Sequence, residues 1–78
     1  MSPPQIIFTR HAEDMLIERR IRREWVERAL STPQSVETDP RRQNVLRAYL
    51  QIPERRGLWL RVVYQMLGTS TKINHGVV

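Results

Sequence analysis

The stretch that most constrains the fold of this chain is residues 57–66, which read G-L-W-L-R-V-V-Y-Q-M. β-Branched and aromatic residues dominate it, its polarity alternates, and a turn with Pro and Gly precedes it, all of which are typical of a strand. We therefore predict that it is the central strand of one small sheet. Successive side chains on a strand point to opposite faces. One face would hold Leu58, Leu60, Val62 and Tyr64, and the other Trp59, Arg61, Val63 and Gln65.

A neighbouring run, Val45–Ile52, also alternates and is predicted to be the partner strand. The five residues P-E-R-R-G link the two runs, a length typical of hairpins whose loop carries a Gly. If the apolar faces of both strands contact helices, polar and aromatic side chains collect on the opposite face. That face would consist of Arg47, Tyr49, Gln51, Trp59, Arg61 and Gln65. A bulge in either strand would break the pattern.

Two helices are predicted before these strands. Thr9 is the expected N-cap of a helix over residues 10–20, whose apolar positions recur every three or four residues. A second helix is expected over residues 23–30 and ends before Pro33, which restricts the residue in front of it. Both helices are short and have one apolar side, so they are expected to cover the sheet.

Further extended segments are predicted over residues 6–8, 35–39 and 71–77. Strict alternation in the last segment puts Lys72 and Asn74 on one side and Ile73, His75 and Val77 on the other, with a phase relative to the sheet that the pattern leaves open. Taken together, the elements predict an α+β fold. Two N-terminal helices would pack on one face of a small, mainly antiparallel sheet of about four strands.

The length of 78 residues indicates a single domain, with residues 1–5 as a flexible lead. The chain has no Cys, and its two His and eight acidic residues show no metal-ligand spacing, so neither a metal nor another cofactor is expected. No run approaches the roughly 18 apolar residues of a membrane span, and the first residues lack the pattern of a secretory signal. We therefore expect a cytoplasmic protein.

The formal net charge of +5 rests almost entirely on arginine, because Lys72 is the only lysine. Guanidinium groups bind phosphate bidentately and stack on bases, which favours RNA as a partner. The same charge would also suit an acidic protein partner, or serve solubility alone.

Three segments carry a resemblance: F-T-R-H-A-E-D-M-L-I-E-R-R-I near the start, W-V-E-R-A-L-S-T-P-Q-S-V in the second helix and its exit, and L-R-V-V-Y in the central strand. With the order of helix, helix and strand meander, they resemble a family of small bacterial proteins of unknown function that is placed alongside the BrnT and RelE/ParE-type toxins. The similarity covers residues 8–64. Its most specific element is the His-Ala pair at the helix start, followed eight residues later by Arg-x-Ile.

This resemblance implies a RelE-like fold and membership of toxin-antitoxin systems, whose toxins cut or otherwise bind RNA and whose antitoxins are small and acidic. The matching positions are His11 and Ala12 at the helix start, Arg19 and Ile21 at its end, and Arg61 with Val62, Val63 and Tyr64 in the strand. The chain departs from the family pattern at Met15, where members often carry Arg, and at Arg20, where they usually have Gly. Its closing strand also lacks the usual Thr-Val-Tyr or Thr-Val-His ending.

Cleavage of RNA without a metal requires groups that move protons and cations that stabilise the phosphorane. His11 is the candidate proton donor or acceptor, and Arg47 and Arg61 are the candidate phosphate ligands. The candidate nucleic-acid-binding residues are Tyr49, Trp59, Gln51, Arg41, Arg42 and Lys72. Trp59 would stack on a base, and Tyr49 could donate a proton weakly.

Each of these residues has an alternative, structural interpretation. His11 could serve structure or contact a partner, and Arg61 could form a surface ion pair with Glu37 or Glu54. Tyr49 and Trp59 could stiffen the sheet as cross-strand neighbours. The arginines in the turns, Arg41, Arg42, Arg55 and Arg56, could simply be solvated. Two other functions therefore stay open: binding of an acidic protein through the same face, or nucleic-acid binding by a regulator without turnover.

Overall fold

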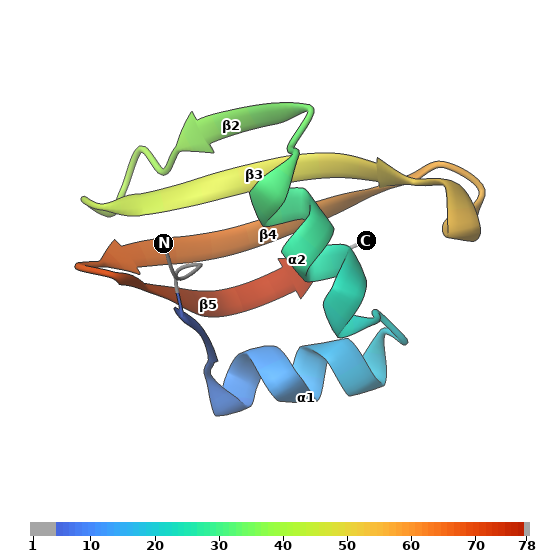
Figure 1. Cartoon of the computed structure of the whole chain (residues 1–78), viewed down its shortest axis with the longest axis horizontal. Helices are drawn as coiled ribbons and strands as arrows, with labels where there is room; N and C mark the ends of the chain where they lie inside the picture. The colour runs from blue at the N-terminus through green and yellow to red at the C-terminus, as the bar shows by residue number, and fades with distance from the viewer. Residues whose placement is uncertain (1–4, 78) are drawn as a thin grey trace.

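The computed structural model of the protein describes residues 5–77, and for residue 77 only the backbone. The elements, drawn in Figure 1, are β1 (Gln5–Phe8), α1 (Arg10–Glu18), α2 (Arg23–Ser31), β2 (Ser35–Thr38), β3 (Val45–Ile52), the 3₁₀ turn η1 (Pro53–Arg55), β4 (Leu58–Leu67) and β5 (Ser70–Val77). The predicted flexible lead lies outside the described residues except for Gln5, which begins β1. Within the described part of the chain, no helix is long and apolar enough to cross a membrane.

The α+β class and the two helices are confirmed, but the sheet has five strands and is mixed. Its order is β1-β5-β4-β3-β2. The fifth strand is β1, which pairs in parallel with β5 from Gln5 opposite Ser70 to Phe8 opposite Ile73. An extended segment was predicted over residues 6–8 but was not counted as a strand of the sheet, because so short a segment shows no clear period of two and its partner lies at the far end of the chain.

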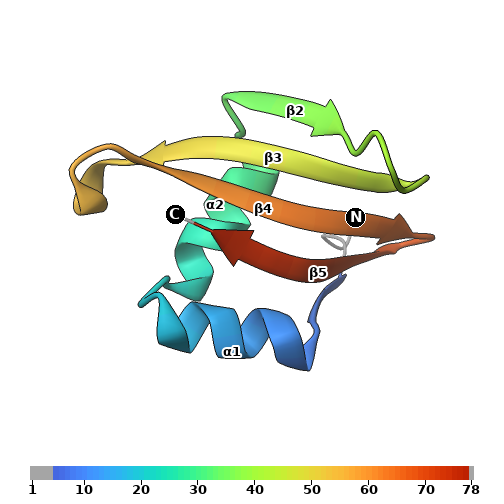
Figure 2. The same ribbon diagram turned by 180° about the vertical axis from the view of Figure 1, so that it is seen from behind.

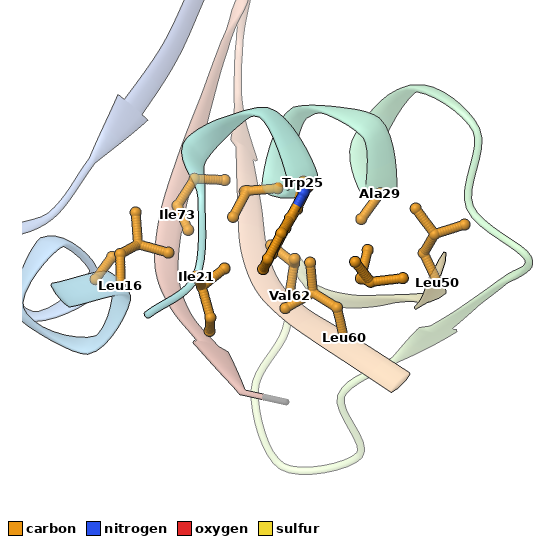
Figure 3. Packing of buried hydrophobic residues seen from close by; sticks show 11 residues of the cluster. Leu16, Ile21, Trp25, Ala29, Leu50, Leu60, Val62 and Ile73 are labelled. Atoms are coloured by element: carbon orange, nitrogen blue, oxygen red, sulfur yellow. The ribbon is translucent and has the colours of Figure 1, made fainter. Parts of the chain in front are cut away.

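The hydrophobic core lies between α1, α2 and one face of the sheet. Figure 3 shows Trp25 and Ala29 of α2 above strand residues such as Leu60. The buried cluster consists of Ala12, Leu16, Ile21, Trp25, Val26, Ala29, Leu50, Ile52, Leu60, Val62 and Ile73. The strand residues of this cluster lie on the predicted apolar faces, so the phase of β3 and β4 is confirmed.

Local sequence explains where α1 begins and ends. The Thr9 hydroxyl oxygen accepts a hydrogen bond from the backbone N–H of Ala12 at 3.1 Å, which confirms the predicted N-cap. At the other end the N–H of Ile21 donates to the carbonyl of Leu16 at 2.8 Å, and Arg20 adopts a left-handed φ of 56°. This is a Schellman ending, in which the left-handed position favours Gly. Ile21, which follows it, is buried in the core.

Strand β5 contains a bulge that strict alternation could not anticipate. Val63 of β4 lies opposite His75, whereas the next residue, Tyr64, lies opposite Ile73, so Asn74 is an extra residue in β5. Ile73 points into the core and His75 therefore takes the opposite side. The prediction that Ile73 and His75 share a face is wrong, because a bulge shifts the phase of the strand.

Candidate functional site

The side of the sheet opposite the helices is here named the open face. In Figure 2 the strands lie in front of α2, so no helix of the described chain covers this side. The open face carries Val45, Arg47, Tyr49 and Gln51 of β3 and Trp59, Arg61, Val63 and Gln65 of β4. The register confirms that Arg47 and Arg61 share one face, because Tyr49 lies directly opposite Arg61 and Arg47 opposite Val63.

Strand β5 adds two residues to the open face through its bulge. His75 lies opposite Val63, and Lys72 lies opposite Gln65. Arg47, Val63 and His75 consequently form one row across three adjacent strands. Since neighbouring strands are about 4.8 Å apart, the backbones of Arg47 and His75 are separated by roughly 10 Å, which long side chains can bridge.

The start of α1 is attached to β5 beside the bulge. The Thr9 hydroxyl donates to the carbonyl of Ile73 at 2.9 Å, and a longer contact of 3.4 Å reaches the carbonyl of Asn74. The same oxygen caps α1, so one hydroxyl fixes both the helix start and its position on the strand. This attachment places His11 next to His75, with ring centroids 6.0 Å apart and ring planes at 76°.

His75 is surrounded by cations. Partial burial lowers its pKa from the ordinary value of 6.5, and the positive charges of Arg61, His11 and Arg42 lower it further. These groups come from β4, α1 and the turn between β2 and β3 respectively. These effects favour the neutral imidazole of His75, and a bound anion would offset the surrounding positive charge.

Arg61 is the open-face arginine without a carboxylate. It forms no ion pair within the described residues, and its Nε–H is shielded from solvent without a hydrogen-bond partner there. The alternative that Arg61 pairs with Glu37 or Glu54 is wrong. Glu37 accepts a hydrogen bond from Tyr49, and Glu54 binds the guanidinium of Arg28. An unpaired guanidinium in a half-buried setting favours an anionic ligand.

Arg47 is already partly neutralised by Asp39, which organises the turn between β2 and β3. Its Nη2 donates to Asp39 Oδ2 at 3.2 Å, while the backbone N–H groups of Arg41 and Arg42 donate to Oδ1. The bond from Arg41 lowers the pKa of Asp39, and Arg47 adds to this effect against the opposing effect of burial. Tyr49 and Asp39 raise the pKa of Arg47, so the guanidinium is a permanent cation.

The two aromatic candidates differ in what they can offer. The Tyr49 hydroxyl donates to Glu37 Oε2 at 3.2 Å, so its proton is engaged. Trp59 is 48% exposed and lies on β4 two residues from Arg61, a spacing of about 6.8 Å along a strand. An exposed indole at that distance can stack on a base next to a phosphate bound at Arg61.

The remaining candidate nucleic-acid-binding residues lie in separate parts of the structure. The side chain of Gln51 is already engaged, because its Oε1 accepts a hydrogen bond from Gln34 Nε2 and its Nε2 donates to the carbonyl of Gly57. Arg41 and Arg42 precede β3, whereas Arg55 and Arg56 follow it, so the turn arginines do not form one cluster. A surface hollow of about 520 Å³ lies next to Arg42. Its lining consists of Thr38, Asp39, Arg42, Gln43, Asn44, Val45, Leu46 and Met66.

The structure brings His11 next to His75, a residue to which the sequence assigned no role, and the charge of Arg61 also acts on His75. No local pattern marks His75, because its position depends on a bulge and on the attachment of α1 to β5. Among residues 5–77, no group of three or more His, Cys, Asp or Glu side chains could hold a metal ion.

Fold and face together define a small, basic α+β domain with an uncovered sheet. The chain belongs to the family described as Domain of unknown function (DUF4258), whose model matches residues 8–73. Membership in a family of small proteins of unknown function is thus confirmed. Comparisons with curated proteins and with solved structures gave no match.

Proposed function

We propose that this chain is a toxin-like protein of the toxin-antitoxin type, related to the BrnT and RelE/ParE toxins, that binds RNA on the open face and cleaves it without a metal. The observation that carries the proposal is the guanidinium of Arg61. It has no carboxylate partner among the described residues, and it lies near His75 on a face without helices. Such a group is suited to a phosphate of a nucleic-acid strand.

Binding would combine charge with stacking. Arg61 and Arg47 contact the phosphate backbone, and Trp59 stacks on a base beside them, which is the usual combination at single-stranded nucleic-acid sites. Lys72, with Arg41 and Arg42 at the same end of the sheet, extends the positive surface. Electrostatic binding of this kind weakens as salt rises.

Cleavage would use the 2′-hydroxyl of the RNA as nucleophile. His11 donates or accepts a proton, and Arg47 and Arg61 stabilise the charge that develops on the phosphorus oxygens. His11 suits this role because it is exposed at the edge of the open face, with its ring next to that of His75. A small acidic antitoxin would inhibit the protein by covering the same face, since its carboxylates would pair with the arginines that bind RNA.

The test is induced expression with growth and total RNA as readouts. Wild type is compared with His11→Ala, Arg61→Ala and Arg22→Ala, the last being an exposed arginine that pairs with Glu24 at the start of α2. We expect growth arrest and RNA fragmentation with wild type and Arg22→Ala, and neither with the other two variants. Normal growth and intact RNA with wild type would overturn the toxin proposal.

A second measurement separates the enzyme from a regulator without turnover. Purified protein is titrated with a fluorescent single-stranded RNA at several salt concentrations, and the products are resolved on a denaturing gel. Salt-sensitive binding with cleavage is expected. Salt-sensitive binding without cleavage would instead assign the open face to a non-catalytic regulator.

A further inference from the structure

We propose that His75 is a catalytic residue of this site, acting with His11 as a proton-transferring pair on a single-stranded RNA held by Arg61. The inference rests on the proposed function and deepens it, because it names the second proton-transfer group and the substrate group that reacts. It also specifies the products, which are a 2′,3′-cyclic phosphate and a free 5′-hydroxyl.

The first support is geometric. The bulge at Asn74 turns His75 onto the open face, and the Thr9 hydroxyl attaches α1 to the carbonyl of Ile73 beside it. The two imidazole centroids are consequently 6.0 Å apart. Each hydrogen bond from a ring nitrogen spans about 2.8 Å, so both rings can reach the same phosphodiester group.

The second support is the charge around the pair. Arg61 from β4, His11 from α1 and Arg42 from the turn between β2 and β3 are the charged groups that influence His75. Together with partial burial they favour the neutral imidazole, which is the form that accepts a proton. The unpaired guanidinium of Arg61 then stabilises the negative charge that the attack creates.

The reaction balances without another reactant. His75 takes the proton of the 2′-hydroxyl, and the 2′-oxygen forms a bond to phosphorus. The bond between phosphorus and the 5′-oxygen breaks, and the protonated imidazole of His11 gives its proton to that oxygen. One proton is taken and one is given, and exchange with water restores both rings.

The positions of the two rings in the fold also explain why the reaction uses two imidazoles. A single His would have to accept a proton from one side of the phosphodiester and donate it to the other. Two rings on separate elements, α1 and β5, divide these tasks between fixed positions. Thr9 is then a positioning residue, because its hydroxyl fixes the helix start that carries His11 relative to the strand that carries His75.

The experiment uses the full chain and two single-stranded RNA probes of one sequence, one natural and one with 2′-O-methyl groups throughout. Wild type, His75→Gln, His11→Gln and the control Arg22→Gln are compared for cleavage rate, affinity and melting temperature. We expect His75→Gln and His11→Gln to cleave at least about 100-fold more slowly, with affinities within about threefold of wild type. The methylated strand should bind and stay intact.

A spectroscopic readout covers the case in which a variant does not fold. The ring of His75 in the wild-type protein is titrated by NMR with and without the methylated RNA. We expect its titration midpoint to rise when the RNA binds, because the phosphate offsets the charge of Arg61. Thr9→Ser should keep the cleavage rate near that of wild type, whereas Thr9→Val should lower it without changing the midpoint of free His75 greatly.

Several results would overturn the inference. These are wild-type cleavage rates in a folded His75→Gln, cleavage of the methylated strand, or a His75 midpoint that does not respond to bound RNA. Binding by wild type without any cleavage would also overturn it, while leaving RNA binding intact. Loss of RNA binding by wild type altogether would instead contradict the proposed function itself.

Discussion

The two sides of this sheet use arginine differently. On the helix side, several guanidinium groups have partners within the fold: Arg28 binds Glu54, Arg23 binds Glu13, and Arg55 donates to the carbonyl of Arg20. On the open face, Arg61 has no such partner in the described chain, and Arg47 shares Asp39 with the turn. A net positive charge therefore says little by itself. What matters is which guanidinium groups the fold leaves uncompensated.

The pair of Arg28 and Glu54 illustrates the helix side. Both nitrogens of the guanidinium donate to the carboxylate, at 3.0 and 2.8 Å, and this connects α2 to the turn η1. The hydrogen bond from Arg28 lowers the pKa of Glu54 to about 2. An arginine that already binds a carboxylate bidentately has little left to offer a phosphate.

The largest expected difference between the two sides is in the stability of variants at two neighbouring residues of β4. Leu60 is fully buried under the helices, whereas Trp59 is 48% exposed on the open face. We expect Leu60→Ala to lower the free energy of unfolding by about 2 to 5 kcal/mol, because it removes buried methyl groups and leaves a cavity. Trp59→Ala should cost less than about 1 kcal/mol.

Urea denaturation followed by circular dichroism measures both changes. Trp59→Ala should in addition weaken binding of single-stranded RNA by about 1 to 3 kcal/mol, the range for loss of one stacking platform. Similar losses of stability in the two variants would contradict the assignment of faces, since only one of the two side chains is in the core.

The next effect contrasts one arginine from each side. We expect Arg61→Gln to weaken RNA binding at least tenfold and to reduce the slope of log K against log salt concentration by about one. Its free energy of unfolding should stay within about 0.5 kcal/mol of wild type. Arg28→Gln removes the same charge but should lower the melting temperature and leave the salt slope unchanged.

Isothermal titration at several salt concentrations and thermal melting provide the two readouts. Equal loss of affinity in both variants would mean that net charge alone binds RNA. The division of arginines between the two sides would then have no functional meaning.

Much of the open face could be predicted from the sequence because its strands are regular. Alternation in β3 and β4 was sufficient to place Arg47 and Arg61 together, and the observed register has Tyr49 opposite Arg61. A period of two is a strong signal when one face is buried, since a slip of one residue would expose every apolar side chain. The capping role of Thr9 could likewise be predicted, because it depends on neighbours in the chain.

The neighbourhood of His11 could not be predicted. His75 is 64 residues away, and it reaches His11 only because β1 closes the sheet beside β5 and a bulge shifts the phase at Asn74. Both features depend on pairing between the two ends of the chain, for which a single sequence offers no local pattern. The environment of Arg61 could not be predicted either. It has no carboxylate partner in the described chain because Glu37 binds Tyr49 and Glu54 binds Arg28.

Arg20 sharpens the comparison because it is a helix-side arginine whose side chain makes no hydrogen bond within the described residues. Its φ of 56° closes the Schellman ending of α1. A left-handed conformation costs a residue with a Cβ about 1 kcal/mol relative to Gly. We expect Arg20→Gly to raise the free energy of unfolding by about this amount, measured by urea denaturation, and to leave RNA binding unchanged.

Arg19 is the matched control for this change. It has a φ of −99°, which suits an ordinary side chain, so Arg19→Gly should lower stability through the greater freedom of the unfolded chain. If both variants changed stability in the same direction, the left-handed position would not be the cause.

The smallest expected effect is a difference between the two sides in their response to pH. Glu54 has an ordinary pKa of 4.5 and a folded pKa of about 2. Between these values the unfolded chain binds the proton that the folded chain does not, so stability falls as pH decreases through this window. The pKa of His75 is also lowered, from an ordinary value of 6.5, chiefly by burial and then by Arg61. Its contribution has the same sign but begins to be lost near pH 6.5.

Thermal melts from pH 8 to pH 2 therefore should show two separable losses. His75→Gln should flatten the curve just below pH 6.5 without affecting the acid limb, and Glu54→Gln should do the reverse. Bound 2′-O-methyl RNA should change only the loss of stability that is due to His75, because a phosphate near Arg61 favours protonated His75. The loss that is due to Glu54 should not change, because the ligand does not contact the helix side. If bound RNA instead reduced the loss of melting temperature in the acid range where Glu54 is protonated, the ligand would lie on the helix side, and the open face would not be the binding surface.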